Sequence, residues 1–130
     1  MNSMTHKNIN QELCGTPVLI KEGSSIVRLR TTDHMAADEE GLVHGGFVFG
    51  MADYAAMLAV NDPYVVLGSA ETKFLKPVTV GEELEAHATI EENVGKKRRV
   101  AVSVFCGETK VLSGVFVCFL LEQHVLKIQK

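Results

Sequence analysis

The chain has 130 residues, which is enough for one domain with its own hydrophobic core and leaves no room for a second. Hydrophobic residues make up 46% of the sequence and charged residues 22%, so we expect an ordered, soluble protein along nearly the whole length. The formal net charge of -3 and the lack of an extended basic stretch argue against a nucleic-acid partner.

The first third of the chain predicts an N-terminal arm followed by a hairpin. Residues 1–16 are expected to form an arm or a short helix, which an asparagine could cap. Two β-rich runs, 18–21 and 25–31, flank a Glu-Gly-Ser turn and predict a pair of strands. Residues 33–41 show no periodicity and predict a loop that leads into the next element.

The segment 45–61 predicts a long helix, because it is apolar almost all round and Asn61-Asp62-Pro63 provides a stop. A helix that is hydrophobic on every side belongs in the middle of a domain. Four β-rich runs follow, each separated from the next by turn residues: 65–75, 83–92, 99–106 and 111–121. The expected architecture is α+β, with a mostly antiparallel sheet that curls around a single central helix.

Asp53 is the only charged residue between Gly45 and Asn61. Burying an unpaired carboxylate costs several kcal/mol, so a sequence that keeps one in an apolar helix must either pair it or use it. Two interpretations stay open at this point. Asp53 is either a catalytic carboxylate, which we favour, or an aspartate that is hydrogen-bonded across an interface.

The predicted helix opens with His44-Gly45-Gly46. Two consecutive glycines leave the backbone N–H groups unobstructed, and the positive end of the helix dipole adds to them, so the segment predicts a site for an oxyanion. The alternative is a tight turn into the helix in which His44 only caps or packs. Proton transfer by His44 is the less favoured interpretation.

The spacing between these groups bears on the assembly of the protein. Gly45 and Asp53 lie eight residues apart, so the helical rise of 1.5 Å per residue separates them by about 12 Å. One helix therefore cannot present both groups to one carbonyl. If both act on the same substrate, they come from different subunits, which predicts a homodimer or a dimer of dimers with shared active sites.

The segment 41–61 resembles the hotdog thioesterases of the phenylacetyl-CoA and 4-hydroxybenzoyl-CoA type. In that family HGG is followed by Asp or Glu nine residues after the His, which is the position of Asp53. Residues 73–77 (KFLKP) with Gly81 resemble a later strand of the same family. The resemblance covers roughly residues 38–121 and implies a hotdog fold.

The resemblance also implies roles for the matching residues. Asp53 would be the nucleophile or the general base, and the N–H of Gly45, with that of Gly46, would polarise the thioester carbonyl. Many members carry Asn six residues before the His, whereas Asp38 stands there in this sequence. A second carboxylate near Asp53 could raise the pKa of one of the two. The basic candidates near the nucleotide phosphates of CoA are Lys73, Lys76, Lys96 and Arg98.

The favoured function is hydrolysis of a small aryl- or short- to medium-chain acyl-CoA to the free acid and CoA, without a metal or other cofactor. Two alternatives use the same fold: an acyl-CoA-binding protein without turnover, and a hydratase or dehydratase. His34, Ser69 and Thr72 are polar groups that could substitute for the missing amide. The basic run 96–99 is either a solvated turn, which we favour, or a phosphate contact.

The cysteines and the N-terminal residues bear on localisation. Cys14, Cys106 and Cys118 are odd in number and widely spaced, which argues against a disulfide framework and a zinc site and fits a reducing compartment. The first fifteen residues lack the apolar core of a signal peptide, and no apolar run reaches the ~18 residues of a membrane span. We therefore expect a cytoplasmic protein without a membrane partner.

Overall fold

The structure is a computed structural model and describes residues 1–128. It contains one long helix, one short helix, two 3₁₀ turns and six strands. The helices and strands are α1 (Gln11–Cys14), β1 (Thr16–Lys21), β2 (Ser24–Arg30), α2 (Gly45–Val60), β3 (Val65–Phe74), β4 (Glu83–Val94), β5 (Lys97–Cys106) and β6 (Thr109–Leu120), and the 3₁₀ turns are η1 (Asp33–Met35) and η2 (Val125–Lys127). No helix among the described residues is long and apolar enough to cross a membrane.

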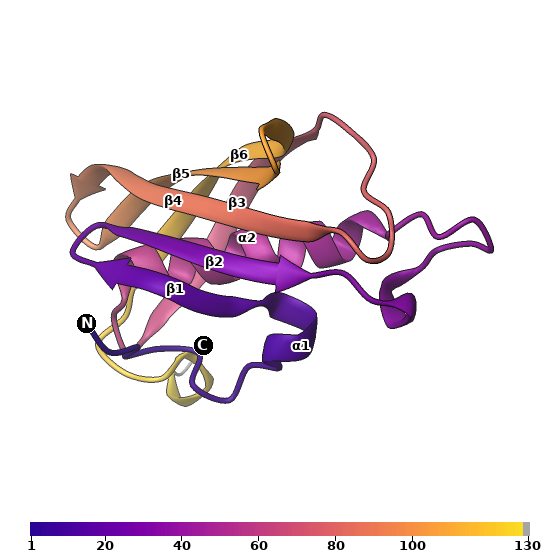
Figure 1. Cartoon of the computed structure of the whole chain (residues 1–130). Helices are drawn as coiled ribbons and strands as arrows, with labels where there is room; N and C mark the ends of the chain where they lie inside the picture. The colour runs from indigo at the N-terminus through magenta and orange to yellow at the C-terminus, as the bar shows by residue number, and fades with distance from the viewer. Residues whose placement is uncertain (129–130) are drawn as a thin grey trace.

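The six strands form one sheet in the order β1-β2-β4-β5-β6-β3, and every neighbouring pair is antiparallel. The sheet curls around α2, which runs along its concave face (Figure 1). The predicted α+β arrangement, with one central helix wrapped by an antiparallel sheet, is thus confirmed. Boundaries differ by one or two residues: β1 begins at Thr16 instead of 18, and β5 and β6 begin at Lys97 and Thr109 instead of 99 and 111. Pro17 is tolerated there because β1 is an edge strand, where a missing N–H leaves no neighbour unbonded.

The central helix is held in place by small side chains and by one buried hydrogen bond. Ala52, Ala55, Ala56 and Ala59 are at most 1% exposed, so the sheet approaches the helix backbone closely on this side. The Ser25 hydroxyl donates to the Ala55 carbonyl at 2.6 Å and ties β2 to α2. Val27, Leu84, Val100, Val102 and Phe116 complete the core between the two layers.

The helix ends at Asn61, which adopts the left-handed conformation (φ 51°) and also anchors the N-terminal arm. Its Oδ1 accepts from the N–H of Met4 at 2.7 Å, and its Nδ2 donates to the carbonyl of Asn2 at 3.0 Å. Further along the arm, the side chain of Asn10 caps α1. The two Asn61 bonds hold the arm against the domain, and the Asn10 cap orders the short helix within it.

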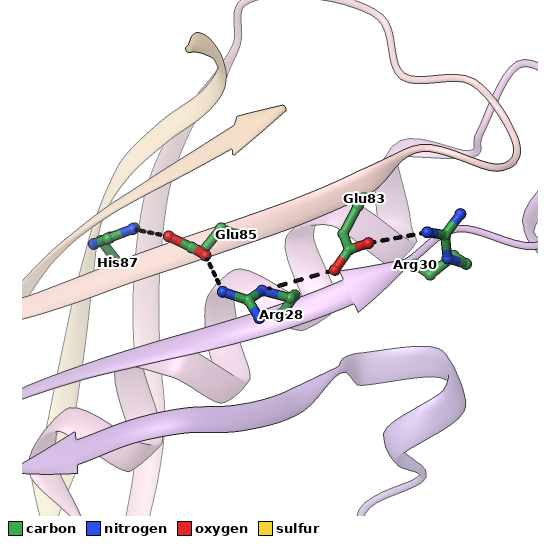
Figure 2. Close-up of polar contacts among 5 residues, drawn as sticks. All are labelled: Arg28, Arg30, Glu83, Glu85 and His87. Atoms are coloured by element: carbon green, nitrogen blue, oxygen red, sulfur yellow. Dashed lines mark hydrogen bonds and ion pairs between the residues drawn. The ribbon is translucent and has the colours of Figure 1, made fainter. Parts of the chain in front are cut away.

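The outer face of the sheet carries an ordered row of charges on β2 and β4 (Figure 2). Arg28 Nη2 lies 2.8 Å from Glu85 Oε2, and Arg30 Nη2 lies 3.0 Å from Glu83 Oε2. His87 Nε2 lies 2.8 Å from the other oxygen of Glu85. Exposed pairs of this kind stabilise a protein by ~1 kcal/mol at most. They identify this face as solvated, so a site built around α2 lies on the opposite face.

Candidate active site

Asp53 lies in the middle of α2, on the stripe of the helix that the sheet leaves partly uncovered. Gly46, Gly50 and Val60 occupy the same stripe and are also incompletely buried. The Oδ1 atom of Asp53 is nevertheless buried and has no hydrogen-bond partner among residues 1–128. Burial raises the pKa of Asp53 to about 6. The carboxylate is therefore a stronger base than an ordinary aspartate and is still mostly ionised at neutral pH.

Two thiols lie close enough to Asp53 to sense its charge. Burial first, and then the negative charge of Asp53, raise the pKa of Cys14 and raise that of Cys118 to about 12. Both thiols are accordingly protonated at neutral pH and are poor nucleophiles, since the thiolate is the reactive form. Of these three groups, Asp53 alone is ionised at neutral pH and available for nucleophilic or base chemistry.

The N-terminus of α2 presents two free amides. His44 is the N-cap residue, and its side chain makes no capping hydrogen bond. The Phe47 N–H donates to the His44 carbonyl at 3.1 Å. The N–H groups of Gly45 and Gly46 find no acceptor within residues 1–128. The exposed His44 ring packs edge-on against Phe47, with 6.0 Å between the ring centroids. The arrangement offers two N–H donors at the positive end of a 16-residue helix.

A hollow of about 330 Å³ opens beside Gly45. Its walls are mostly apolar side chains, and Lys76 contributes the one charged group. The lining includes Gly45, Val48, Phe74, Leu75, Pro77 and Val111. A Cβ atom on Gly45 would come within 3.1 Å of the Phe74 ring, so the glycine lets the ring and the helix start approach each other. An apolar group of modest size would fit in this hollow next to Gly45.

The amides and the carboxylate are nevertheless separate within one chain. Gly45 and Asp53 belong to one uninterrupted helix, so they are about 12 Å apart along its axis. Each half of the arrangement is incomplete without the other. Within one chain, the amides of Gly45 and Gly46 do not reach the Asp53 carboxylate.

A family model with the description "Thioesterase superfamily" matches residues 40–113, which is more than half of the chain and includes Gly45, Asp53 and Lys76. The chain belongs to the thioesterase superfamily. The predicted hotdog fold is thereby confirmed, together with the family that the sequence resembles.

Three similar proteins extend the comparison. An uncharacterized protein from Pyrococcus horikoshii, PH1136, is 57% identical, and the alignment covers 98% of both chains with a TM-score of 0.97. A methylthioribose-1-phosphate isomerase from Aquifex aeolicus is 54% identical over 94% of this chain but only 27% of its own length. The transcription factor FapR from Caldanaerobacter subterraneus is 31% identical over 82% of this chain and 52% of its own length. The chain thus spans between a quarter and a half of the curated relatives it matches.

Asp38, which stands where many thioesterases of this type carry Asn, lies in the exposed loop before α2. Its Oδ1 accepts from the N–H groups of Glu40 at 3.0 Å and Leu42 at 3.1 Å, so it fixes the loop that leads to His44. Burial is what raises the pKa of Asp53, without a contribution from Asp38 in the same chain. The expectation that a second carboxylate perturbs Asp53 is therefore not met within one chain.

The four basic residues do not form one cluster. Lys76 lines the hollow beside Gly45, and Lys73 is exposed near the same end of β3. Lys96 and Arg98 lie on the β4–β5 hairpin, where Arg98 shares a hollow with Val60 and Asn61 at the other end of α2. Lys96 is paired with Glu122, with 3.1 Å between Nζ and Oε1.

Two features near these groups have no signal in the local sequence. Cys14 and Cys118 are 104 positions apart in the chain, yet both lie close to Asp53. Lys21 at the end of β1 lines the same hollow as Arg98. Only the pairing of distant segments in the fold reveals these neighbours.

Proposed function

We propose that this member of the thioesterase superfamily hydrolyses acyl-CoA esters with small aryl or short- to medium-chain acyl groups. The observation that carries the proposal is the Asp53 carboxylate, which sits in an apolar helix with one buried oxygen lacking a partner among residues 1–128. A buried carboxylate with a raised pKa is typical of a group that takes part in chemistry. The free amides of Gly45 and Gly46 supply the complementary electrostatic element.

In the proposed reaction Asp53 acts as a general base. A water oxygen attacks the thioester carbonyl carbon while one water proton passes to the carboxylate, and the resulting oxyanion is held by the Gly45 N–H with help from Gly46. The tetrahedral intermediate then collapses, the C–S bond breaks, and the CoA thiolate takes up the proton. Alternatively, an Asp53 oxygen attacks the carbonyl carbon and the C–S bond breaks, which gives an acyl anhydride and CoA thiolate. Water then cleaves the anhydride to the free acid and the Asp53 carboxylate, and a proton of that water passes to the thiolate.

The proposed enzyme is a homodimer, or a dimer of dimers, with shared sites. Each site combines the carboxylate of one copy with the amides of another, because about 12 Å separate the two within one helix. The uncovered stripe of α2 around Gly46, Gly50 and Asp53 is the face that the second copy would approach. Asp38 acts in this proposal by positioning the loop before Gly45, and His44 acts through its backbone as the helix cap.

A second candidate is an acyl-CoA-binding protein without turnover. It is favoured by the match to FapR, which is named as a transcription factor and of which this chain spans about half. The hollow beside Gly45 would serve binding as well as catalysis. This chain matches only about a quarter of the Aquifex aeolicus protein that is named an isomerase. That name therefore gives no support for isomerase activity in this chain.

A hydrolysis screen separates the two candidates. The purified chain is offered a panel of acyl-CoA esters from acetyl to decanoyl, together with phenylacetyl and benzoyl esters, and released CoA is trapped with a thiol-reactive dye. Thioesterase activity predicts turnover of at least one ester that Asp53→Asn abolishes. Saturable binding of an ester without turnover in the wild type would instead establish the binding protein.

A further inference from the structure

The N-terminal arm forms a strap, residues 2–14, that runs along α2. The C-cap residue of α2 holds the strap at one end through two hydrogen bonds to its backbone. Further along, the His6 ring lies against the ring of Tyr54, with 6.4 Å between the centroids. At the other end, Cys14 packs against the core and senses the charge of Asp53. The strap therefore covers part of the helix that carries the candidate carboxylate.

His6 is the point where the strap bends. Its backbone adopts the left-handed conformation (φ 52°), which residues other than glycine keep only where surrounding contacts hold them in it. The hydroxyl of the buried Thr5 lies 2.7 Å from His6 Nδ1, and the Ile9 N–H donates to the His6 carbonyl at 3.2 Å. These contacts and the packing on Tyr54 fix the backbone and the imidazole together. The conformation of the strap therefore depends on the state of this ring.

The half-buried His6 ring borders a hollow of about 350 Å³ between the strap, the beginning of β3 and the C-terminal turn η2. Figure 1 shows η2 next to the beginning of the strap. Most of the lining is apolar, and the polar side chains that share the hollow with His6 are Thr5, Tyr64 and His124. No carboxylate is among the residues that line the hollow, and within residues 1–128 no ion pair includes His6. A positive charge on His6 would thus be uncompensated while the strap is closed.

The protonation of His6 is consequently linked to the position of the strap. Burial lowers the pKa of His6 from its ordinary value of 6.5, whereas a strap released from α2 would present an imidazole with the ordinary pKa. Because the closed strap has the lower pKa, the released strap takes up the proton first as the pH falls below about 6.5. Acid therefore shifts the equilibrium towards release, and the closed strap is fully favoured above this pH.

We propose that His6 is a pH-sensitive fastener: in its neutral form it holds the strap on α2 beside Asp53, and in its protonated form it releases the strap. Release would let water reach the flank of Asp53 that Cys14 occupies in the closed form. The inference concerns the cover of the candidate site and does not depend on which reaction the site performs. It adds to the proposed function a control by acid that the site residues alone do not supply.

Other titratable groups face the strap and have to be separated from His6. Lys7 and Glu12 lie on the strap itself, and their side chains are exposed. His124 shares the hollow with His6, and Asp53, with a pKa of about 6, lies near Cys14 at the other end. His124 and Asp53 are therefore the two residues that need control variants.

The test is amide hydrogen exchange of the full chain, followed by NMR between pH 7.5 and pH 5 and corrected for the intrinsic exchange rate. The amides of Met4 and Ile9 report on the closed strap, because they donate to Asn61 and to His6. Their protection should fall roughly 3-fold or more towards pH 5, since each pKa unit between the open and closed strap is worth about 10-fold. Val102, in the middle of β5, should keep its protection and so excludes global unfolding.

Three variants assign the effect to one residue. His6→Asn tolerates the left-handed conformation and never becomes positively charged. Its strap should be less protected than that of the wild type, because the packing on Tyr54 is lost, but equally so at both pH values. His124→Asn keeps a side chain that can cap η2, and Asp53→Asn removes the other titrating group. Both of these variants should retain the pH dependence of the wild type.

Several results would overturn the proposal. They are wild-type protection that does not change with pH, the same change in His6→Asn, and loss of the pH dependence in His124→Asn or Asp53→Asn. A wild-type His6 ring that titrates at or above pH 6.5 in NMR would also overturn it. If His6→Asn leaves the strap unprotected at every pH, the fastening role is upheld and the ring titration decides its pH dependence. None of these measurements uses turnover, so their outcome is independent of the tests of hydrolysis.

Discussion

Replacing Asp53 by Asn tests whether the protein keeps a destabilising group for the sake of function. Burial raises the pKa of Asp53 from 3.8 to about 6, a difference of roughly 2 units, or about 3 kcal/mol between the protonated and ionised forms. Because the folded-state pKa is the higher one, the unfolded chain holds fewer protons between these values. The ionised group therefore destabilises the fold in full above about pH 6, and this effect disappears as the pH falls below the unfolded value.

Asp53→Asn removes the charge and keeps the shape of the side chain. At pH 8 we expect the variant to be more stable than the wild type by about 1 to 3 kcal/mol, since the amide still leaves a buried polar group without a partner. At about pH 4 the difference should shrink towards zero. Urea unfolding at the two pH values measures this, and Asp33→Asn, the same change at an exposed site, should alter stability equally little at both.

Turnover should move in the opposite direction. Loss of the base or nucleophile lowers kcat by about 10²-fold or more, and wild-type kcat should fall as the pH drops through about 6, where Asp53 takes up a proton. The reasoning fails if Asp53→Asn is less stable at pH 8 and still turns over within a few-fold of the wild type. That pattern belongs to an aspartate kept to satisfy a hydrogen-bond partner.

Three further predictions concern the other half of the site and the assembly. Gly45→Ala pushes a methyl group against Phe74, so kcat should fall about 10-fold or more with little change in melting temperature; unaltered kcat would remove the amide from the mechanism. Co-expression of Asp53→Asn with Gly45→Ala should restore about a quarter of wild-type activity, because half of the dimers then combine the two variants and hold one intact site. An active monomer in size-exclusion chromatography with light scattering would refute shared sites. Lys73→Ala should raise KM for CoA esters more than it lowers kcat, with a smaller effect at high salt, and an unchanged KM would leave Lys73 as a solvated side chain.

The architecture could be predicted because its signals are local and redundant. A helix without a polar face, placed between a hairpin and four further strands, leaves few arrangements in which it is buried. Asp53 stood out for the same reason, as the one charge in that helix. The start of β1 was missed because a proline argues against a strand, and only the edge position in the sheet makes Pro17 acceptable.

The surroundings of the candidate site were beyond prediction because they depend on long-range pairing. Asn61 bonds to Met4 across 57 positions, and nothing in either local sequence specifies this contact. The basic residues were grouped by their similar chemistry, but the antiparallel hairpins place Lys76 and Arg98 at opposite ends of α2. The two ends of an extended strand of ten or twelve residues lie far apart in space. Spacing along the chain therefore says little about which cationic side chains lie close together.

The position of Asp53 on α2 indicates how a second copy would change its pKa and its surroundings. In one chain the carboxylate lies on a stripe of α2 that the sheet leaves partly open, and the pKa of about 6 reflects that partial burial. A second copy covering the stripe would remove more water and raise the pKa further, while its helix N-terminus would favour the ionised form and lower it. The two effects oppose each other. Where the two effects balance, Asp53 stays ionised near neutral pH in a drier site, and there the same N–H donors stabilise an oxyanion more strongly than they do in water.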